Sequence, residues 1–355
     1  MSNSLQPIKT PSSTRENRPS TLPVEPSLNT KIEGKTSSCD LCKADDTVIA
    51  KDFSLDNYRI VMCQKCRLMY ASPPLKPETL DTFYEDTFAN DPGCRRRAGS
   101  DFPPDKDRKK EEIHAENWGI KIIKQYIDPR GKNILDLRCR TGALTSILRG
   151  EGAEVLGVEP FQGNANYARE VRGLSNVIDL PFSQFHEFPL PQDEYFDVVN
   201  MLPHHVLAHV LSPRIFLERV FKVLKPGGYV FLDEKDVLRP DRHKKQSPLD
   251  SGPAHQFHLT LHTTAAYFCS TGFELLECEI DKKRSSDFRH IRIVAQKPKA
   301  RGATSTFPNQ VNIGTGPNIQ AIRWRLWWLE RTWGIRLAKI RFKRKSQKVL
   351  KRFNF

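Results

Sequence analysis

Strand-like and helix-like segments alternate from residue 132 to residue 299, and this alternation limits the fold more than any other feature of the chain. Short apolar runs predict strands, in order NILDL, EVLGVE, NVID, YFDVVNML, GYVFLDE, FELLECEID and HIRIVAQK. Segments of helical periodicity predict helices between them, in order ALTSILRGE, FQGNANYAREV, LSPRIFLERVFKVL and TTAAYFCSTG. The alternation predicts an α/β domain with a mostly parallel sheet covered on both faces. Ligands of such folds bind at the carboxyl ends of the strands.

Two cysteine pairs precede this domain. Cys39-x2-Cys42 and Cys63-x2-Cys66 are separated by twenty residues, and the alternating segment between them predicts a β-hairpin that brings the pairs together. Tetrahedral Zn2+ takes four thiolates, and a two-residue gap lets both sulfurs of a pair face one ion. We therefore expect a structural zinc ribbon over residues 38–75. Adventitious pairs, or disulfides of an exported protein, are the alternatives.

The first 37 residues are rich in Ser, Thr and Pro and are expected to be a disordered tail. They lack the apolar core of a signal peptide, and no apolar run reaches the roughly 18–20 residues of a membrane span. These features predict a cytoplasmic protein, with organelle targeting as the weaker alternative. A connector of helix and charged loop is expected over residues 76–131.

Positive charge is concentrated at the other end of the chain. Residues 319–355 hold twelve Lys and Arg against one acid, a net of +11 out of the formal +14, together with four of the five tryptophans. After a flexible linker at residues 300–318, this tail predicts a basic amphipathic helix suited to an anionic membrane surface. RNA, or packing on protein, is the alternative partner. The rest of the chain is nearly neutral, which argues against a nucleic-acid-binding body.

Several motifs in a fixed order resemble class I S-adenosylmethionine-dependent methyltransferases, in particular bacterial members that open with a zinc ribbon. They are the cysteine pairs, ILDLRCRTG, GVEP, FDVVNMLPHHVLAHV, VLKPGGYVFLDE and HQFHLTLHTTAAYFCSTGFELLE. The resemblance covers residues 39 to 298. It implies a Rossmann-like seven-stranded sheet with the cofactor across the ends of its first four strands.

The resemblance also implies which residues meet the cofactor. Glu159 ends the second strand, where a carboxylate accepts hydrogen bonds from both ribose hydroxyls. Asp136 ends the first strand and would orient the loop or contact the methionine ammonium through water. Phe182 lies where relatives contact the adenine, and Met201 would line the adenosine side. Gly142 is the last glycine of the cofactor loop.

That loop departs from the family pattern. Relatives usually read D-x-G-x-G-x-G, whereas this chain reads Asp136-Leu-Arg138-Cys-Arg140-Thr-Gly142. Glycine permits positive φ and lets the backbone approach the ligand closely. An Arg138 side chain that pointed inward would clash with the cofactor and repel its sulfonium, whereas one that pointed to solvent would leave a weakened site.

Histidines follow the fourth strand and precede the last helix. His204 and His205, with His209, lie near the strand end where an acceptor would arrive, and His255 and His258 approach from AHQFH. A neutral imidazole there could take a proton from a hydroxyl or amine, so His204, His205 and His258 are the catalytic candidates. The alternative is a loop or helix-start histidine without a catalytic role.

Three functions remain open. The first is an S-adenosylmethionine-dependent methyltransferase acting on a small-molecule, glycosyl or lipid-linked acceptor, peripheral on a membrane. The second is a pseudo-methyltransferase, a scaffold that has lost the cofactor because of Arg138 and Arg140. The third is an RNA methyltransferase or binder.

Overall fold

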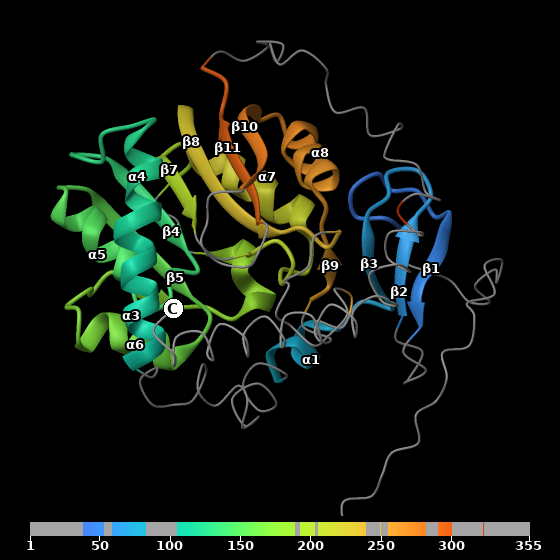
Figure 1. Cartoon of the computed structure of the whole chain (residues 1–355), viewed down its shortest axis with the longest axis horizontal. Coiled ribbons are helices and arrows are strands. Elements are labelled where there is room, and N and C mark those ends of the chain that lie inside the picture. Colours follow the sequence, from blue (N-terminus) through green and yellow to red (C-terminus); the bar gives the residue numbers. More distant parts are fainter. Residues whose placement is uncertain are drawn as a thin grey trace, which may run out of the picture. The chain divides into compact units, whose positions relative to one another are not determined.

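The computed structural model describes residues 38–52, 59–82, 105–188, 192–202, 205–238, 249, 255–281, 290–299 and 322 (Figure 1). All of them belong to one compact unit. The predictions for residues 1–37, for the linker at 300–318 and, except for Ile322, for the basic tail lie outside the described residues, as does His204.

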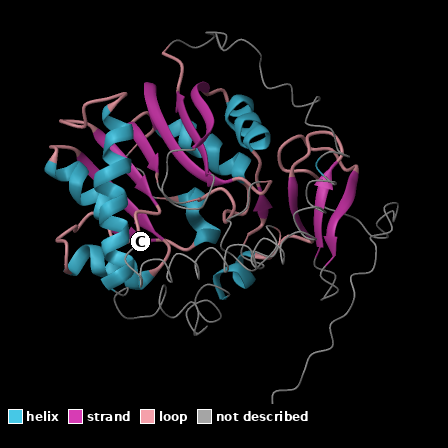
Figure 2. Cartoon of the chain, in the orientation of Figure 1, coloured by secondary structure: helices cyan, strands magenta, loops and turns pink. Residues whose placement is uncertain are grey.

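A seven-stranded sheet forms the larger part, which confirms the predicted α/β, Rossmann-like fold (Figures 1 and 2). Its order is β10-β11-β8-β7-β4-β5-β6. The strands are β4 (Asn133–Leu137), β5 (Glu154–Glu159), β6 (Val177–Asp179), β7 (Phe196–Met201), β8 (Leu224–Lys235), β10 (Glu274–Asp281) and β11 (His290–Gln296). Strands β6, β5, β4, β7 and β8 run parallel, and β11 pairs antiparallel with both β8 and β10. From β4 the chain continues through β5 and β6 on one side of the sheet and then through β7 and β8 on the other side. The direction of strand succession therefore changes between β4 and β7, which is where open α/β sheets bind ligands.

Alternate residues of the central strands enter two different apolar cores. In β4, Leu135 and Leu137 pack in one core and Ile134 in the other; in β7, Val199 and Val198 divide in the same way. Because successive side chains of a strand point to opposite faces, both faces of the sheet are covered. The first core includes α7 (Pro213–Val223) and α8 (Leu261–Thr271), and the second includes α4 (Ile120–Lys124) and α5 (Ala143–Gly150).

The helix expected in the connector extends from Asp105 to Lys124. It consists of α3 (Asp105–His114), a π-helical turn η2 (Ala115–Gly119) and α4 in direct succession. The other described helices are α1 (Pro77–Thr82), α6 (Gln162–Glu170) and a 3-10 helix η3 (Phe182–Glu187). None of the described helices combines the length and the apolar character that a bilayer crossing demands.

A second, antiparallel sheet contains the predicted hairpin. Strands β1 (Thr47–Asp52), β2 (Arg59–Cys63) and β3 (Met69–Ser72) lie side by side, and the order is completed by β9 (Phe257–His258). The sequence did not predict β9 as a strand, because two residues are too few to show a period. The ribbon sheet therefore takes its last strand from the segment that carries His258.

Local signals fix the starts of the two helices that follow the histidine segments. The Ser212 side chain accepts a hydrogen bond from the Ile215 N–H at the start of α7, and Pro213 occupies the first turn. Thr260 and Thr263 form a reciprocal capping box at the start of α8. Both helices thus begin at defined residues close to the candidate site.

Candidate functional site

The loop after β4 takes the backbone conformation of a glycine-rich loop although it carries two arginines. Arg138 has φ 61°, Arg140 has φ 53° and Gly142 has φ 75°. The left-handed region costs a non-glycine residue on the order of 1–3 kcal/mol, so the surrounding contacts must hold the loop in place. The N–H groups of Arg138 and Cys139 both donate to the Val158 carbonyl, at 2.7 and 3.1 Å.

Glu159, at the end of β5, is buried and binds this loop. Its Oε2 accepts the Arg140 N–H at 2.9 Å, and its Oε1 accepts the Asn164 amide at 2.9 Å and the Phe161 N–H at 3.3 Å. The side chain is 0% exposed. Burial raises the pKa of this carboxyl, against the lowering by the Asn164 amide and by the Arg138 charge. Glu159, the residue predicted to bind the ribose, thus lies at the expected strand end, and protein groups donate hydrogen bonds to both of its carboxylate oxygens.

Asp136, at the end of β4, is held by two neighbouring side chains. Thr145 donates to its Oδ2 at 2.6 Å, and the Asn200 amide donates to its Oδ1 at 2.8 Å. Burial raises the pKa of Asp136 to about 7, while both hydrogen bonds act in the opposite direction. The carboxyl joins the ends of β4 and β7 beside the loop.

Glu111, on α3, is a loop contact that the sequence did not indicate. Its Oε1 accepts the Thr141 N–H at 3.1 Å, and its Oε2 lies 3.7 Å from Arg140 Nε. Arg140 therefore directs its backbone toward Glu159 and its guanidinium toward Glu111. In the sequence, Glu111 is one of several acids in a charged helical segment. Such acids are too common for the sequence to show which of them contacts the loop.

The Arg138 side chain crosses from the loop to two neighbouring segments. Its Nη1 donates to the His205 carbonyl after β7. Its guanidinium carbon lies 5.3 Å from the centre of the Phe182 ring at the start of η3. This ring is stacked with His209, at a centroid distance of 5.0 Å and an interplanar angle of 19°. The guanidinium thus links the segments that follow β4, β6 and β7. Of the two directions that the sequence left open, the Arg138 side chain takes the inward one.

This position decides whether S-adenosylmethionine fits the residues present. Glu159 and Asp136 stand where the cofactor would need acceptors. Phe182 is 1% exposed, however, and its ring contacts the Arg138 guanidinium. Met201 is fully buried in the first core. The acceptors at the strand ends suit the cofactor, but the Arg138 guanidinium lies between the His205 carbonyl and the Phe182 ring, so this side chain would have to move for the cofactor to bind there.

Gly142 closes the loop and begins α5. A Cβ at this position would lie 2.4 Å from Leu174 Cδ1 and 3.2 Å from Ala168 Cβ. Positive φ and the lack of space both require glycine here. The loop has thus kept glycine at the position where the packing of α6 and the following turn leaves no room.

Four histidines gather next to Arg138. His205 and His209 lie in the turn after β7, and His255 and His258 lie at β9. Burial lowers the pKa values of His205 and His255 well below the usual range. Burial and the nearby Lys235 charge lower the pKa of His258 to about 4. This group of four histidines includes two of the three predicted catalytic residues, His205 and His258.

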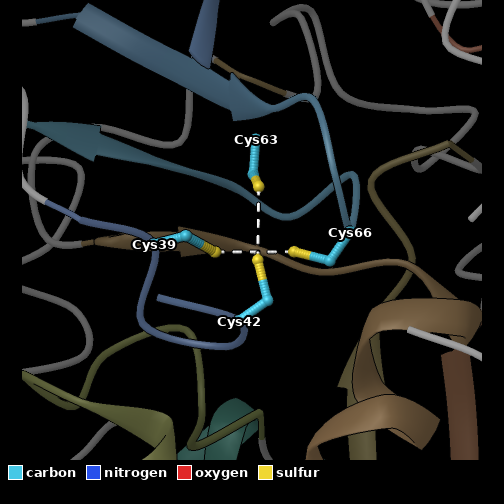
Figure 3. A group of neighbouring side chains, drawn as sticks. All are labelled: Cys39, Cys42, Cys63 and Cys66. Carbon is cyan, nitrogen blue, oxygen red and sulfur yellow. Dashed lines mark hydrogen bonds between the residues drawn. The ribbon is translucent and has the colours of Figure 1, made fainter. Parts of the chain in front are cut away.

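The four ribbon cysteines point their sulfurs toward a common centre (Figure 3). The Sγ atoms of Cys39 and Cys66 are 3.4 Å apart, and those of Cys42 and Cys63 are 3.5 Å apart. A tetrahedral ion with sulfur at roughly 2.3 Å sets neighbouring sulfurs about 3.8 Å apart. The four thiols fit a tetrahedral metal ion with a small outward shift.

The ribbon holds the histidine segment in place. Tyr70 and Met69 of β3 pair with Phe257 and His258 of β9. The Ala71 N–H donates to the Gln256 carbonyl, and the Leu75 N–H donates to the Gln256 side chain, both at 2.8 Å. The position of His258 therefore depends on the fold of the ribbon.

Comparison with known proteins agrees with this architecture. Residues 112–278 match the protein family described as a methyltransferase domain. An uncharacterized methyltransferase of Schizosaccharomyces pombe is 33% identical over 142 residues, which make up 37% of this chain and 50% of that protein. The ubiquinone biosynthesis O-methyltransferase of Pseudomonas fluorescens (strain SBW25) is 31% identical over 118 residues, 32% of this chain and 47% of that protein. The chain spans about half the length of these curated relatives.

A solved S-adenosylmethionine-dependent methyltransferase from Mesorhizobium loti is 17% identical, with a TM-score of 0.42, over 52% of this chain and 98% of that one. The strand order described above agrees with the match of residues 112–278 to a methyltransferase domain.

Proposed function

We propose that this chain is an S-adenosylmethionine-dependent methyltransferase whose cofactor groove is closed by Arg138 until the cofactor displaces that side chain. The observation that supports it most is the family match over residues 112–278, combined with Glu159 and Asp136 at the ends of adjacent parallel strands. When bound, the cofactor supplies a methyl group activated by a sulfonium.

Displacement of Arg138 has an identifiable cost. The side chain would give up its hydrogen bond to the His205 carbonyl and its contact with the Phe182 ring. A hydrogen bond from a charged donor contributes about 1.5–3 kcal/mol and an arginine over an aromatic face about 0.5–2 kcal/mol. The cofactor is therefore expected to bind more weakly than to a loop with glycine at this position.

The acceptor we propose is a small-molecule, glycosyl or lipid-linked compound that offers a hydroxyl or amine. His258 supports this part of the proposal, because its Nε2 is buried and has no hydrogen-bond partner among the described residues. A neutral imidazole in that position can receive the acceptor's proton. His205 and the undescribed His204 are the other candidates for this role.

Four cysteines of the ribbon are proposed to hold a structural zinc ion, and the observation that supports it is the convergence of their sulfurs. A closed site with four thiolates leaves no open coordination position, so the ion would stabilise the ribbon and take no part in transfer. We expect chelation to lower the melting temperature of the intact chain, and serine at Cys39 and Cys66 to lower it without any chelator.

Calorimetric titration with S-adenosylmethionine and S-adenosylhomocysteine tests the main proposal, with the unmutated chain beside an Arg138→Gly, Arg140→Gly double variant. Binding to both proteins, tighter in the double variant, is expected. Arg149→Ala is the control, because Arg149 lies on α5 and its guanidinium binds the Gly173 carbonyl. Failure of both proteins to bind either compound would contradict the proposal.

One observation favours a second function. Arg138 links the segments that follow β4, β6 and β7 through its contacts with the His205 carbonyl and the Phe182 ring, as expected of a scaffold that has lost methyl transfer. Binding that appears only in the double variant would support this pseudo-methyltransferase instead.

A further inference from the structure

Three histidines beside the candidate site form a cluster that neither the family match nor the cysteine ribbon accounts for. His205, His209 and His255 each place one ring nitrogen so that all three atoms lie within 4.8 Å of one another. The ring centroids of His209 and His255 are 4.5 Å apart. The ring centroid of His205 lies 5.4 Å from that of His209 and 5.8 Å from that of His255. The rings thus converge from two separate chain segments.

Backbone hydrogen bonds join these two segments. The Gln256 N–H donates to the Ala208 carbonyl at 2.9 Å, and the Phe257 N–H reaches the same oxygen at 3.4 Å. The His209 N–H donates to the Val206 carbonyl at 3.0 Å, which closes the turn after β7. The fold therefore holds the backbones of the two histidine segments together.

The nitrogen atoms available suit a cation. His205 Nδ1 is buried and has no hydrogen-bond partner among the described residues. Three imidazole nitrogens are a ligand set for Zn2+ that leaves a fourth coordination position open. Nitrogen at roughly 2.1 Å from a tetrahedral ion sets neighbouring nitrogens about 3.4 Å apart. A modest inward rotation of the rings would bring the observed arrangement to that spacing.

Two cationic side chains and one buried carboxyl group lie near the histidine cluster. The positive charges of Arg138 and Lys235 lie close enough to His205 and to Glu234 to shift the pKa values of both groups. Glu234 is fully buried near the end of β8. Arg138 directs its Nη1 to the His205 carbonyl oxygen. Burial raises the pKa of Glu234 to about 8, so this carboxyl offsets the repulsion of the two cations on an incoming ion only once it is ionised, above neutral pH.

We propose that His205, His209 and His255 bind a divalent transition-metal ion, with Zn2+ as the ion expected in the cell, at a site separate from the four cysteines. The His258 ring lies 6.5 Å from the His255 ring, and three protein ligands leave a fourth coordination position of the ion open. There an oxygen of the acceptor can bind the metal and lose its proton more readily; this last role rests on the proposed function, whereas metal binding does not.

Metal analysis of the full-length chain, purified without chelator, tests the proposal. We expect about two zinc ions per chain if the cysteine cluster is also filled, and one fewer in the His209→Asn and His255→Asn variants. His186→Asn is the matched control, since His186 lies on η3 next to Glu187, outside the histidine cluster, and this variant should keep the full content. A zinc content that is the same in all four proteins would overturn the proposal.

Cobalt titration of the metal-free, unmutated chain gives a second measurement that does not depend on how well any variant folds. Cobalt bound by thiolates shows a sulfur-to-metal charge-transfer band, whereas cobalt bound by three imidazoles does not. We expect one tightly bound equivalent of cobalt without this band. If every tightly bound equivalent gives the thiolate band, the histidine cluster holds no metal.

Discussion

At the scale of single residues, Gly142 is the loop position with the least freedom to change. Gly142→Ala should lower the free energy of unfolding by about 1–3 kcal/mol, because it combines positive φ with overpacking against Leu174. Denaturant unfolding would measure this loss. Gly150→Ala in α5 is the control: nothing lies within 4 Å of the added Cβ, and the change should be neutral or mildly stabilising. Equal effects of the two substitutions would contradict the account of the loop.

Asp136 provides a pH-dependent prediction. Its pKa of about 7 in the folded protein lies above the roughly 3.9 of an unfolded aspartate, so the folded state binds its proton more tightly. This contribution to stability is complete below about pH 4 and is lost as the pH rises toward 7.

Asp136→Asn removes this titration. The unfolding free energy of the unmutated chain, measured relative to the variant, should therefore fall between about pH 4 and pH 7 and stay level above that range. Denaturant unfolding of both proteins at a series of pH values checks it. A difference that does not vary with pH would mean that Asp136 titrates alike in both states.

The sequence predicted the position of a side chain correctly only where the backbone determines the direction of that side chain. Glu159 and Asp136 end strands, so the strand period and the sheet register placed them correctly beside the loop. The Arg138 side chain has several rotatable bonds, and both an inward and an outward course satisfied the sequence. Contacts with Phe182 and the His205 carbonyl, which are distant in sequence, decide between the two courses.

At the scale of elements, one ribbon residue ties the cysteine cluster to two helices. Asp40 lies between Cys39 and Cys42; its Oδ1 accepts the Ser212 hydroxyl at 2.6 Å, and its Oδ2 accepts the Tyr267 hydroxyl at 2.9 Å and the Arg214 N–H at 3.1 Å. Ser212 caps α7, and Tyr267 belongs to α8. The carboxylate thus replaces water for three donors at once.

Asp40→Ala should therefore cost about 2–4 kcal/mol of unfolding free energy, because the Tyr267 hydroxyl is buried and would lose its acceptor. Asp45→Ala changes an exposed carboxylate of the same loop and should have an effect within about 0.5 kcal/mol. Thermal or denaturant unfolding of the two variants decides the matter. A loss of similar size in both would show that the Asp40 contacts do not stabilise the junction.

The strands and helices of the domain could be predicted because five parallel strands, buried on both faces, form clear apolar runs separated by amphipathic helices. The pairing of β9 with β3 could not be predicted. A two-residue strand has no period, and its partner lies far away in sequence. The approach of the two histidine segments was expected from the sequence, because one follows the fourth strand and the other precedes the last helix. The backbone hydrogen bond from Gln256 to the Ala208 carbonyl, which joins these segments, could not be predicted.

At the scale of the whole molecule, positive charge lies mostly in residues 319–355, outside the described residues apart from Ile322. We propose that this tail binds anionic membrane surfaces, where each Lys or Arg contributes about 1 kcal/mol at low salt. The full-length chain should sediment with vesicles that contain phosphatidylserine and should be released as the salt concentration rises. A chain ending at residue 318 is the control. Equal sedimentation of the two chains would contradict a membrane role for the tail.

The account depends above all on Arg138, and the affinity for S-adenosylhomocysteine of separate Arg138→Gly and Arg140→Gly variants tests it most directly. The Arg138 side chain contacts the His205 carbonyl and the Phe182 ring, whereas the Arg140 guanidinium turns to Glu111 and its N–H to Glu159. We predict that Arg138→Gly tightens binding at least about thirtyfold, which corresponds to about 2 kcal/mol. Arg140→Gly should change the affinity by much less. Equal affinities in the two variants and the unmutated chain would show that Arg138 does not close the groove.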